Sequence, residues 1–173
     1  PNNNQGWGRV DITETLFPSN RAIKLIDRIP FAENEEFAWI VETTEAAPLD
    51  VQLCWIDYAG DSGDQTEPRL VNDLDLAVRP LDDPAGKVLY GNGGESEDRL
   101  NTMESVRIAK AAPQRYLVTV NCETILHDCT EGGAAALYIR GVFDPEAVST
   151  DYGRVRIQET GELYMSLDKA VAA

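Results

Sequence analysis

The sequence has few of the residues on which most enzymes and nucleic-acid-binding proteins rely. Its 173 residues include one histidine, His127, and only 15 lysines and arginines against 30 aspartates and glutamates, which gives a net charge of −15 at pH 7. A protein field of this sign repels phosphate and so argues against nucleic acids and anionic membranes as partners. No apolar run approaches the roughly 20 residues that a membrane-spanning helix needs. The sequence therefore predicts neither a nucleic-acid-binding protein nor one with a membrane span.

Recognisable catalytic motifs are also missing from the sequence. A Ser-His-Asp hydrolase needs a histidine beside its nucleophile, whereas His127 lies in the short stretch between Cys122 and Cys129. The sequence contains no G-x-S-x-G, H-E-x-x-H, P-loop or dinucleotide-binding motif. We therefore predict that this chain alone is not an enzyme. A glycosidase that uses a pair of carboxylates stays open as a third possibility, because acids are abundant and nothing singles out one pair.

Three cysteines are present, and their positions differ in meaning. Cys122 and Cys129 bracket a polar stretch typical of a hairpin tip, and we predict a disulfide there, which the chain-entropy model values at about 2–3 kcal/mol. A metal site of these two residues with His127 lacks a fourth ligand. Cys54 lies in an apolar run, where we expect a small buried side chain. A disulfide implies an oxidising compartment. We therefore expect an exported protein, and we interpret the start at Pro1, without an initiator methionine, as a processed or excised piece.

Apolar and polar residues alternate with a period of two along most of the chain, which is typical of half-buried strands. Clusters of Gly, Pro, Asp and Asn separate these runs, and no stretch combines helical periodicity with helix caps. Many short strands at roughly even spacing predict an all-β fold, a jelly-roll β-sandwich. The expected strands lie near residues 22–29, 37–42, 51–56, 74–79, 116–120 and 136–143.

The pattern changes after Asp144-Pro145. We assign the sandwich to residues 20–144 and a C-terminal hairpin and tail to residues 145–173. Two short apolar runs there, at residues 153–157 and 162–167, are separated by a Glu-Thr-Gly turn, which favours a terminal hairpin.

A few acidic residues occupy strand positions where an unpaired carboxylate is unfavourable. Asp73 and Asp75 are two residues apart and project from the same face of a strand. Glu104 lies two and four residues before Val106 and Ile108, so on a strand it projects from the same inward face. A carboxylate there costs several kcal/mol unless it is paired or binds a cation. Ca²⁺ takes six to eight oxygen ligands of this kind. The alternative is that these acids cap turns by accepting backbone N–H bonds.

Several segments, in order, resemble the C-terminal β-sandwich of secreted subtilisin-like serine peptidases, a jelly roll related to the convertase P-domain. The most specific is the heptad Leu70-Val71-Asn72-Asp73-Leu74-Asp75-Leu76. The others are Gln5 to Asp11, which is similar to the end of a subtilase catalytic domain, then Leu53 to Asp57, Tyr90-Gly91-Asn92, Asp98 to Glu104 and Pro113 to Val120. The chain departs from the family pattern at Cys54, Thr102 and Gln114-Arg115.

The resemblance implies a role as well as a fold. The parent would be a secreted serine endopeptidase with its catalytic Asp, His and Ser upstream of Pro1, and residues 1–19 would be the end of that catalytic domain and a linker. The sandwich would stabilise the catalytic domain, its partner, and assist access of protein substrates. The family often carries Ca²⁺, for which the resemblance implies ligands or site organisers at Asp57, Asp73, Asp75, Asn101 and Glu104.

A second reading from another class stays open. A jelly roll with bound Ca²⁺ is also typical of free-standing modules that bind carbohydrate or protein, since fold alone does not fix function. Such a module would use an exposed aromatic platform, for which Trp39 or Tyr58 are the candidates.

Overall fold

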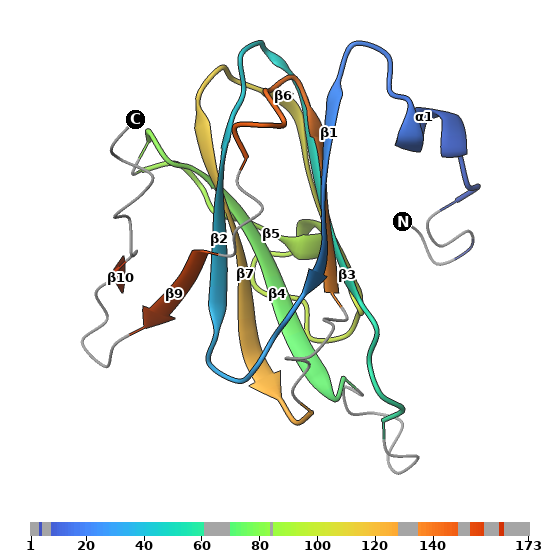
Figure 1. Ribbon diagram of the computed structural model, residues 1–173, viewed down its shortest axis with the longest axis vertical. Helices are drawn as coiled ribbons and strands as arrows, with labels where there is room; N and C mark the ends of the chain where they lie inside the picture. The colour runs from blue at the N-terminus through green and yellow to red at the C-terminus, as the bar shows by residue number, and fades with distance from the viewer. Residues whose placement is uncertain are drawn as a thin grey trace.

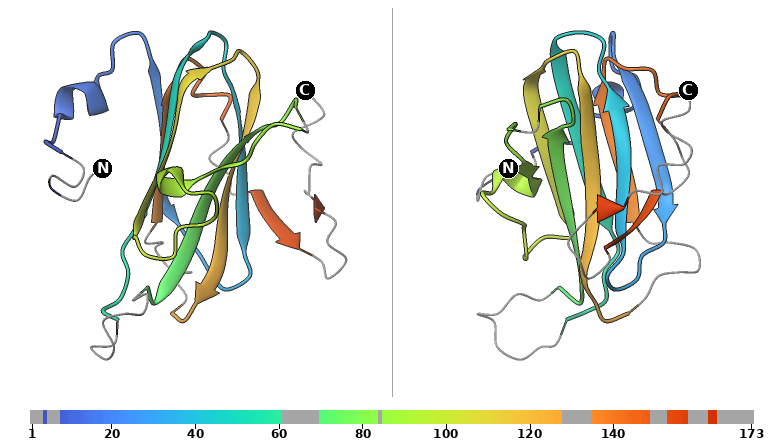
Figure 2. Two further views of the ribbon diagram at one scale, coloured as in Figure 1. Left: turned by 180° about the vertical axis from the view of Figure 1, so that it is seen from behind. Right: turned by 90° about the vertical axis from the view of Figure 1, so that its left-hand side faces the viewer.

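Two antiparallel sheets lie face to face in the structure, a computed structural model (Figures 1 and 2). It describes residues 4, 8–60, 70–83, 85–127, 135–148, 153–157 and 163–164. One sheet has the order β1-β8-β3-β6, and the other has the order β10-β9-β2-β7-β4-β5. The strands are β1 (Ala22–Ile29), β2 (Glu36–Glu42), β3 (Ala47–Trp55), β4 (Asn72–Pro80), β5 (Leu89–Tyr90), β6 (Met103–Ala111), β7 (Arg115–Ile125), β8 (Ala135–Gly141), β9 (Gly153–Ile157) and β10 (Leu163–Tyr164).

The strand order confirms the predicted jelly-roll sandwich. The chain crosses from one sheet to the other at almost every connection, so that β1, β3, β6 and β8 form one sheet while β2, β4, β5 and β7 form the other. All pairings are antiparallel. This is the arrangement of two interlocked Greek keys. The strand β9 pairs with β2 and extends the second sheet beyond the eight strands of the jelly roll.

The period-two pattern of the sequence becomes the core between the sheets. In β2 the residues Phe37, Trp39 and Val41 are buried, and the residues that alternate with them are less buried. The facing strands supply Leu49, Val51 and Leu53 from β3, together with Leu137 and Ile139 from β8, all fully buried. Burial of each such side chain contributes about 1.5–3 kcal/mol. Val148 also lies in this core, so the packed sandwich continues past the predicted boundary at residue 144.

Some local expectations are wrong. The helix α1 (Ile12–Leu16) forms near the start of the described chain, where Asp11 caps it by accepting the Glu14 N–H at 3.2 Å. One turn is too short to produce a helical period in the sequence. Cys54 is exposed because it alternates with the buried Leu53 and Trp55 and so faces outward from β3. No helix in the described part of the chain is long and apolar enough to cross a membrane.

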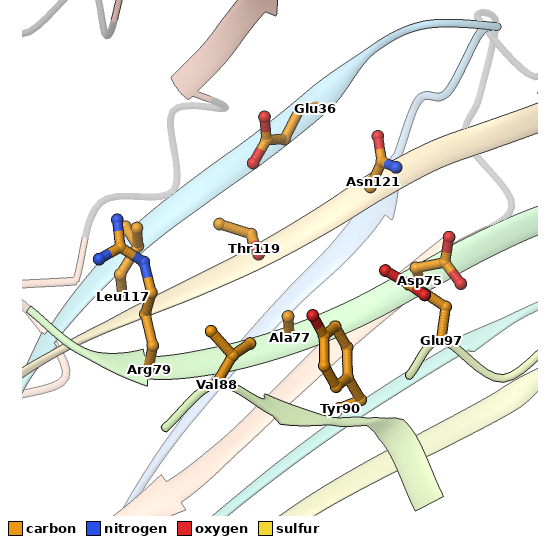
Figure 3. A pocket seen from close by; sticks show the side chains of 10 residues that line it. All are labelled: Glu36, Asp75, Ala77, Arg79, Val88, Tyr90, Glu97, Leu117, Thr119 and Asn121. Atoms are coloured by element: carbon orange, nitrogen blue, oxygen red, sulfur yellow. The ribbon is translucent and has the colours of Figure 1, made fainter. Parts of the chain in front are cut away.

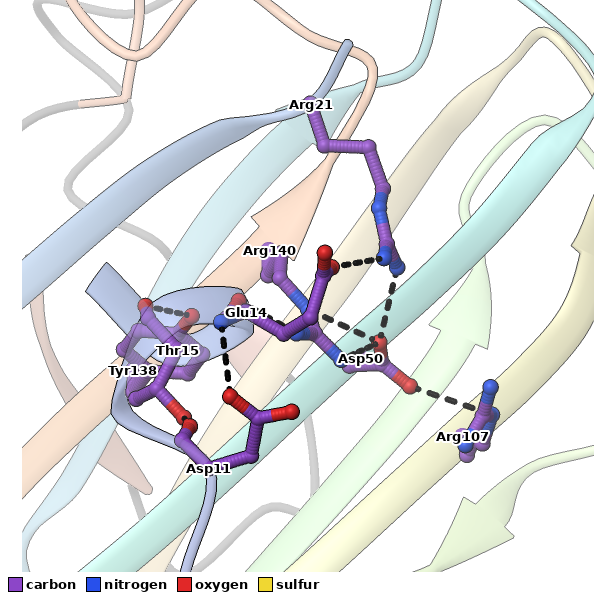
Figure 4. A network of polar contacts seen from close by, with 8 residues as sticks. All are labelled: Asp11, Glu14, Thr15, Arg21, Asp50, Arg107, Tyr138 and Arg140. Carbon is purple, nitrogen blue, oxygen red and sulfur yellow. Dashed lines mark hydrogen bonds and ion pairs between the residues drawn. The ribbon is translucent and has the colours of Figure 1, made fainter. Parts of the chain in front are cut away.

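The helix α1 lies outside the sandwich, beside β1 (Figures 1 and 2). Polar contacts with the outer face of the four-stranded sheet hold it there (Figure 4). The Tyr138 hydroxyl donates to the Thr15 carbonyl at 2.7 Å, and the Arg140 guanidinium donates to the Glu14 carbonyl at 2.8 Å. Beneath them the buried Asp50 carboxylate pairs with three arginines, Arg21, Arg107 and Arg140. The segment is thus anchored by its backbone carbonyls, and α1 buries no side chain.

Candidate functional site

The acidic residues of β4 are paired with an arginine. Asp73 and Asp75 project from the same face of the strand, as predicted, and the Arg99 Nη1 atom lies 2.6 Å from Asp73 Oδ2 and 2.9 Å from Asp75 Oδ2. Burial and, after it, the neighbouring Asp73 raise the pKa of Asp75 to about 7, although Arg99 opposes the rise. One guanidinium therefore supplies the positive charge that the two carboxylates require.

Glu104 connects the two sheets from the inside. Its side chain is fully buried, as its inward parity predicts, and leaves β6 to accept the Leu76 N–H of β4 at 2.7 Å. The amide of Leu76 is available because β5 pairs with β4 only at Ala77 and Val78. Burial raises the pKa of Glu104 to about 8, and the neighbouring Asp75 adds to the rise. Glu104 thus completes the hydrogen bonding of a strand edge that β5 leaves open.

The loop between β5 and β6 is held by side chains of the motif residues. Asn92, at φ 56°, accepts the Ser105 N–H at 3.1 Å and donates to the Met103 carbonyl at 3.0 Å, so its amide pairs with the edge of β6 as a strand would. Asp98 accepts from Asn92 at 2.5 Å and from Asn101 at 2.7 Å. Although burial raises the pKa of Asp98, these hydrogen bonds lower it below its usual range.

Asp57 also stabilises the fold, from the segment that follows β3. Its carboxylate accepts the Val71 N–H at 2.8 Å and the Asn72 N–H at 3.0 Å, which fixes the start of β4 against the end of β3. Asn72 then exchanges two hydrogen bonds with the backbone of His127, each at 3.1 Å. The Trp55 indole N–H donates to the Asn72 carbonyl at 3.0 Å.

The structure therefore brings together three of the five predicted calcium ligands. Asp73, Asp75 and Glu104 are neighbours, whereas the Asp57 carboxylate accepts from the start of β4 and the Asn101 amide donates to Asp98. Each of the three neighbours has one buried carboxylate oxygen without a hydrogen-bond partner among the described residues: Asp73 Oδ1, Asp75 Oδ1 and Glu104 Oε1. As they stand, the described residues include no group of three or more His, Cys, Asp or Glu side chains placed to hold a metal ion.

Two residues of this region were missed at the sequence level. Arg99 and Gly91 both lie in the segments that carry the family resemblance, but a basic residue and a glycine in an acidic, glycine-rich loop are ordinary. Only the fold places Arg99 between Asp73 and Asp75 and Gly91 against Glu104.

The remaining candidate residues do not gather into a site. Cys122 lies in the core as a free thiol, and burial raises its pKa to about 12. Its predicted partner, Cys129, lies outside the described residues. The ring of His127 lies against the ring of Tyr58 at 4.6 Å between centroids. Trp39 is 2% exposed, so the prediction that it forms a sugar-binding surface is wrong. Tyr58 is the exposed aromatic of the two.

Comparison with solved structures gives distant matches to this chain. Neither a protein-family model nor a curated protein matches this chain. A solved structure of a protein from Sulfurospirillum deleyianum is similar to it, with 10% sequence identity, coverage of 72% of this chain and 98% of that chain, and a TM-score of 0.37. A likeness at this level implies no shared function.

Proposed function

We propose that this chain is a non-catalytic β-sandwich domain that accompanies a subtilisin-like peptidase domain in an exported parent protein and stabilises it. The motifs that resemble the family support this role. Their residues make the contacts described above: Asp57 at the start of β4, Glu104 at its open edge, and Asn92 and Asp98 in the following loop. The resemblance thus covers residues that this fold uses for its own construction.

One observation carries the docking part of the proposal, namely four largely exposed apolar side chains in the N-terminal segment. Val10, Ile12, Leu16 and Phe17 are 89%, 62%, 56% and 74% exposed. Single exposed apolar residues are common, but four within eight residues mark a contact surface. The preceding domain is the partner that lies next along the chain, and the first motif segment is similar to its end. Residues 5–7 of that segment lie outside the described residues.

The anchoring of this segment explains how docking would stabilise a neighbour. The helix carries the exposed side chains, while Tyr138, Arg140 and the Asp50 cluster tie its backbone to β8 and β3. Asp50 is 7% exposed at its side chain and holds two of its arginines from strands of the same sheet. A partner bound to the helix would therefore be held by the sandwich through the hydrogen bonds of Tyr138 and Arg140, of which Arg140 is itself held by the buried Asp50.

The first test is the reading frame upstream of Pro1, where we expect a peptidase domain with a G-T-S-M-A-type nucleophile segment. In that parent protein, Phe17→Ser removes an apolar contact of roughly 1–2 kcal/mol, so the rate of thermal inactivation of the peptidase should rise about five- to thirtyfold. Leu126→Ser is the matched control, because the side chain of Leu126 is similarly exposed, at 68%, but follows β7, away from α1. Absence of a peptidase domain, or equal inactivation rates for the two variants, would contradict the proposal.

Ca²⁺ binding remains part of the proposal at Asp73, Asp75 and Glu104. Each has one buried oxygen without a hydrogen-bond partner among the described residues, and carboxylate oxygens are the ligands that a hard cation prefers, while Arg99 supplies the positive charge in the present arrangement. Ca²⁺ at these oxygens would add charge compensation for the Glu104 carboxylate, which the guanidinium does not contact in any described hydrogen bond.

We expect millimolar Ca²⁺ to raise the melting temperature and a chelator to reverse the rise. At a hundredfold excess over Kd, binding to the native state alone adds about 2.7 kcal/mol to the unfolding free energy. The rise should be larger in Arg99→Gln, which lacks the competing guanidinium, than in the control Arg115→Gln, which breaks the exposed pair with Asp82. Calorimetry that finds no Ca²⁺-dependent shift in any of the three proteins would exclude a cation site here.

A further inference from the structure

A hollow of about 250 Å³ lies on the outer face of the six-stranded sheet, over β2, β7, β4 and β5 (Figure 3). The strand register builds it in rows. Asn121 of β7 pairs with Glu36 on one side and with Asp75 on the other, so these three outward side chains form a polar row. The next row consists of Thr119, Ala77 and Tyr90. The hollow forms because the short side chains of Ala77 and Thr119 lie next to a row of longer polar side chains on the same sheet.

The second row gives the hollow its floor and one wall. Ala77 and Thr119 are short, so the sheet is low at this point, and the ring of Tyr90 rises beside them from β5 (Figure 3). An aliphatic stem fits over a floor of this kind, and an aromatic face also attracts a cation that lies on it.

The polar end of the hollow has an excess of negative charge. Glu36, Asp75 and Glu97 line it, against the single cation Arg79, which lies at the other end (Figure 3). Arg79 lies near enough to Glu36 to lower the pKa of that carboxyl, against the larger effect of burial. Glu97 and the Asp75 oxygen that Arg99 does not bond thus remain as the acidic groups that a ligand would meet.

Asp75 provides the second observation that points to a ligand. Its side chain is only 4% exposed, and Arg99 holds one carboxylate oxygen from outside the lining of the hollow. The other oxygen, Oδ1, is buried and has no hydrogen-bond partner among the described residues. A buried carboxylate oxygen without a donor is costly, and a bound cation would remove that cost.

We propose that this hollow binds the side chain of a lysine or arginine from a protein segment laid across the sheet. The aliphatic stem lies over Ala77 and Thr119 beside Tyr90, and the ammonium or guanidinium group pairs with Asp75 and Glu97. Arg79, at the far end, donates to the backbone carbonyls of the segment. A free diamine has no backbone carbonyls and cannot make this contact. This proposal does not depend on the peptidase parentage.

The test is a titration of the ¹⁵N-labelled chain with N-acetyl-lysine methylamide, followed through the amide signals of Ala77 and Thr119. We expect both signals to shift, with a Kd in the millimolar range typical of one side chain. N-acetyl-norleucine methylamide has a similar stem without the charge and should bind at least about fivefold more weakly. Cadaverine, which carries the charges without a peptide backbone, should also bind more weakly than the lysine amide.

Two loop variants separate recognition of charge from general effects. Glu97→Gln should weaken binding of the lysine amide by about two- to fivefold, the range of a partly exposed ion pair. Glu95→Gln, in the same loop but outside the lining of the hollow, should leave it unchanged. Equal binding of the lysine and norleucine amides, or no shift with either, overturns the proposal. Tighter binding of cadaverine than of the lysine amide overturns the assignment to a protein segment.

Discussion

Replacement of Gly91 by alanine is expected to destabilise the protein by about 2–5 kcal/mol, because its new Cβ would meet a buried carboxylate. That Cβ would lie 2.2 Å from Glu104 Oε2 and 2.7 Å from Glu104 Cδ. Glu104 is fully buried and bonded to the Leu76 N–H, so it has no open space into which to move. Urea unfolding followed by the fluorescence of the buried Trp39 and Trp55 measures the loss.

Two control variants separate the proposed clash from ordinary loss of a glycine. Gly93→Ala is in the same turn at φ 75°, but its Cβ would meet nothing within 4 Å, so only backbone strain of about 1 kcal/mol is expected. Glu104→Ala removes the carboxylate, after which only the 2.8 Å contact with Cβ remains. In that background Gly91→Ala should cost at least about 1 kcal/mol less than in the native protein. Purely additive costs would mean that Gly91 and Glu104 do not interact.

The strands that sequence alone predicted are those in which one face enters the core. The residues Phe37, Trp39 and Val41 illustrate this, since their alternation follows directly from burial of one side of β2. The same logic found Glu104, whose inward parity is confirmed by complete burial. It failed for Cys54, because in Leu53-Cys54-Trp55 a cysteine on the outer face of β3 looks as apolar as its buried neighbours.

The partners of the acidic residues depend on long-range contacts that no local pattern encodes. Glu104 bonds to an amide 28 positions away in the other sheet, and Arg99 reaches back 24 residues to Asp75. Asp57 accepts from the Val71 and Asn72 amides, 14 and 15 residues away, whereas Asn101 donates to Asp98 within its own loop. The sequence predicted which carboxylates need a partner, whereas the crossing of the chain between sheets decides whether that partner is an amide, an arginine or an ion.

Stability of the native protein is expected to fall as the pH rises from about 6 to 8.5, and Glu104→Gln should remove most of this fall. Burial raises the pKa of Glu104 from its ordinary value of 4.5 to about 8. At about 1.4 kcal/mol for each unit of pKa change, this shift represents several kcal/mol. The native state therefore holds the proton over a range in which the unfolded chain has released it. Under this condition the free energy of unfolding decreases with rising pH and becomes level above the native pKa.

Urea unfolding at a series of pH values between 5 and 8.5 tests this linkage. Glutamine keeps a carbonyl oxygen for the Leu76 N–H and cannot ionise, so any cost of the substitution itself is the same at every pH. The free energy of unfolding of the variant should therefore rise relative to that of the native protein as the pH rises. The pH dependence that remains in the variant below pH 7 belongs to Asp75, whose pKa is about 7. Asp82→Asn is the control, because Arg115 lowers the pKa of that exposed carboxyl and its titration lies below the range. Parallel pH profiles for the native protein and Glu104→Gln would show that the pKa of Glu104 is not raised in the fold, which would contradict this prediction.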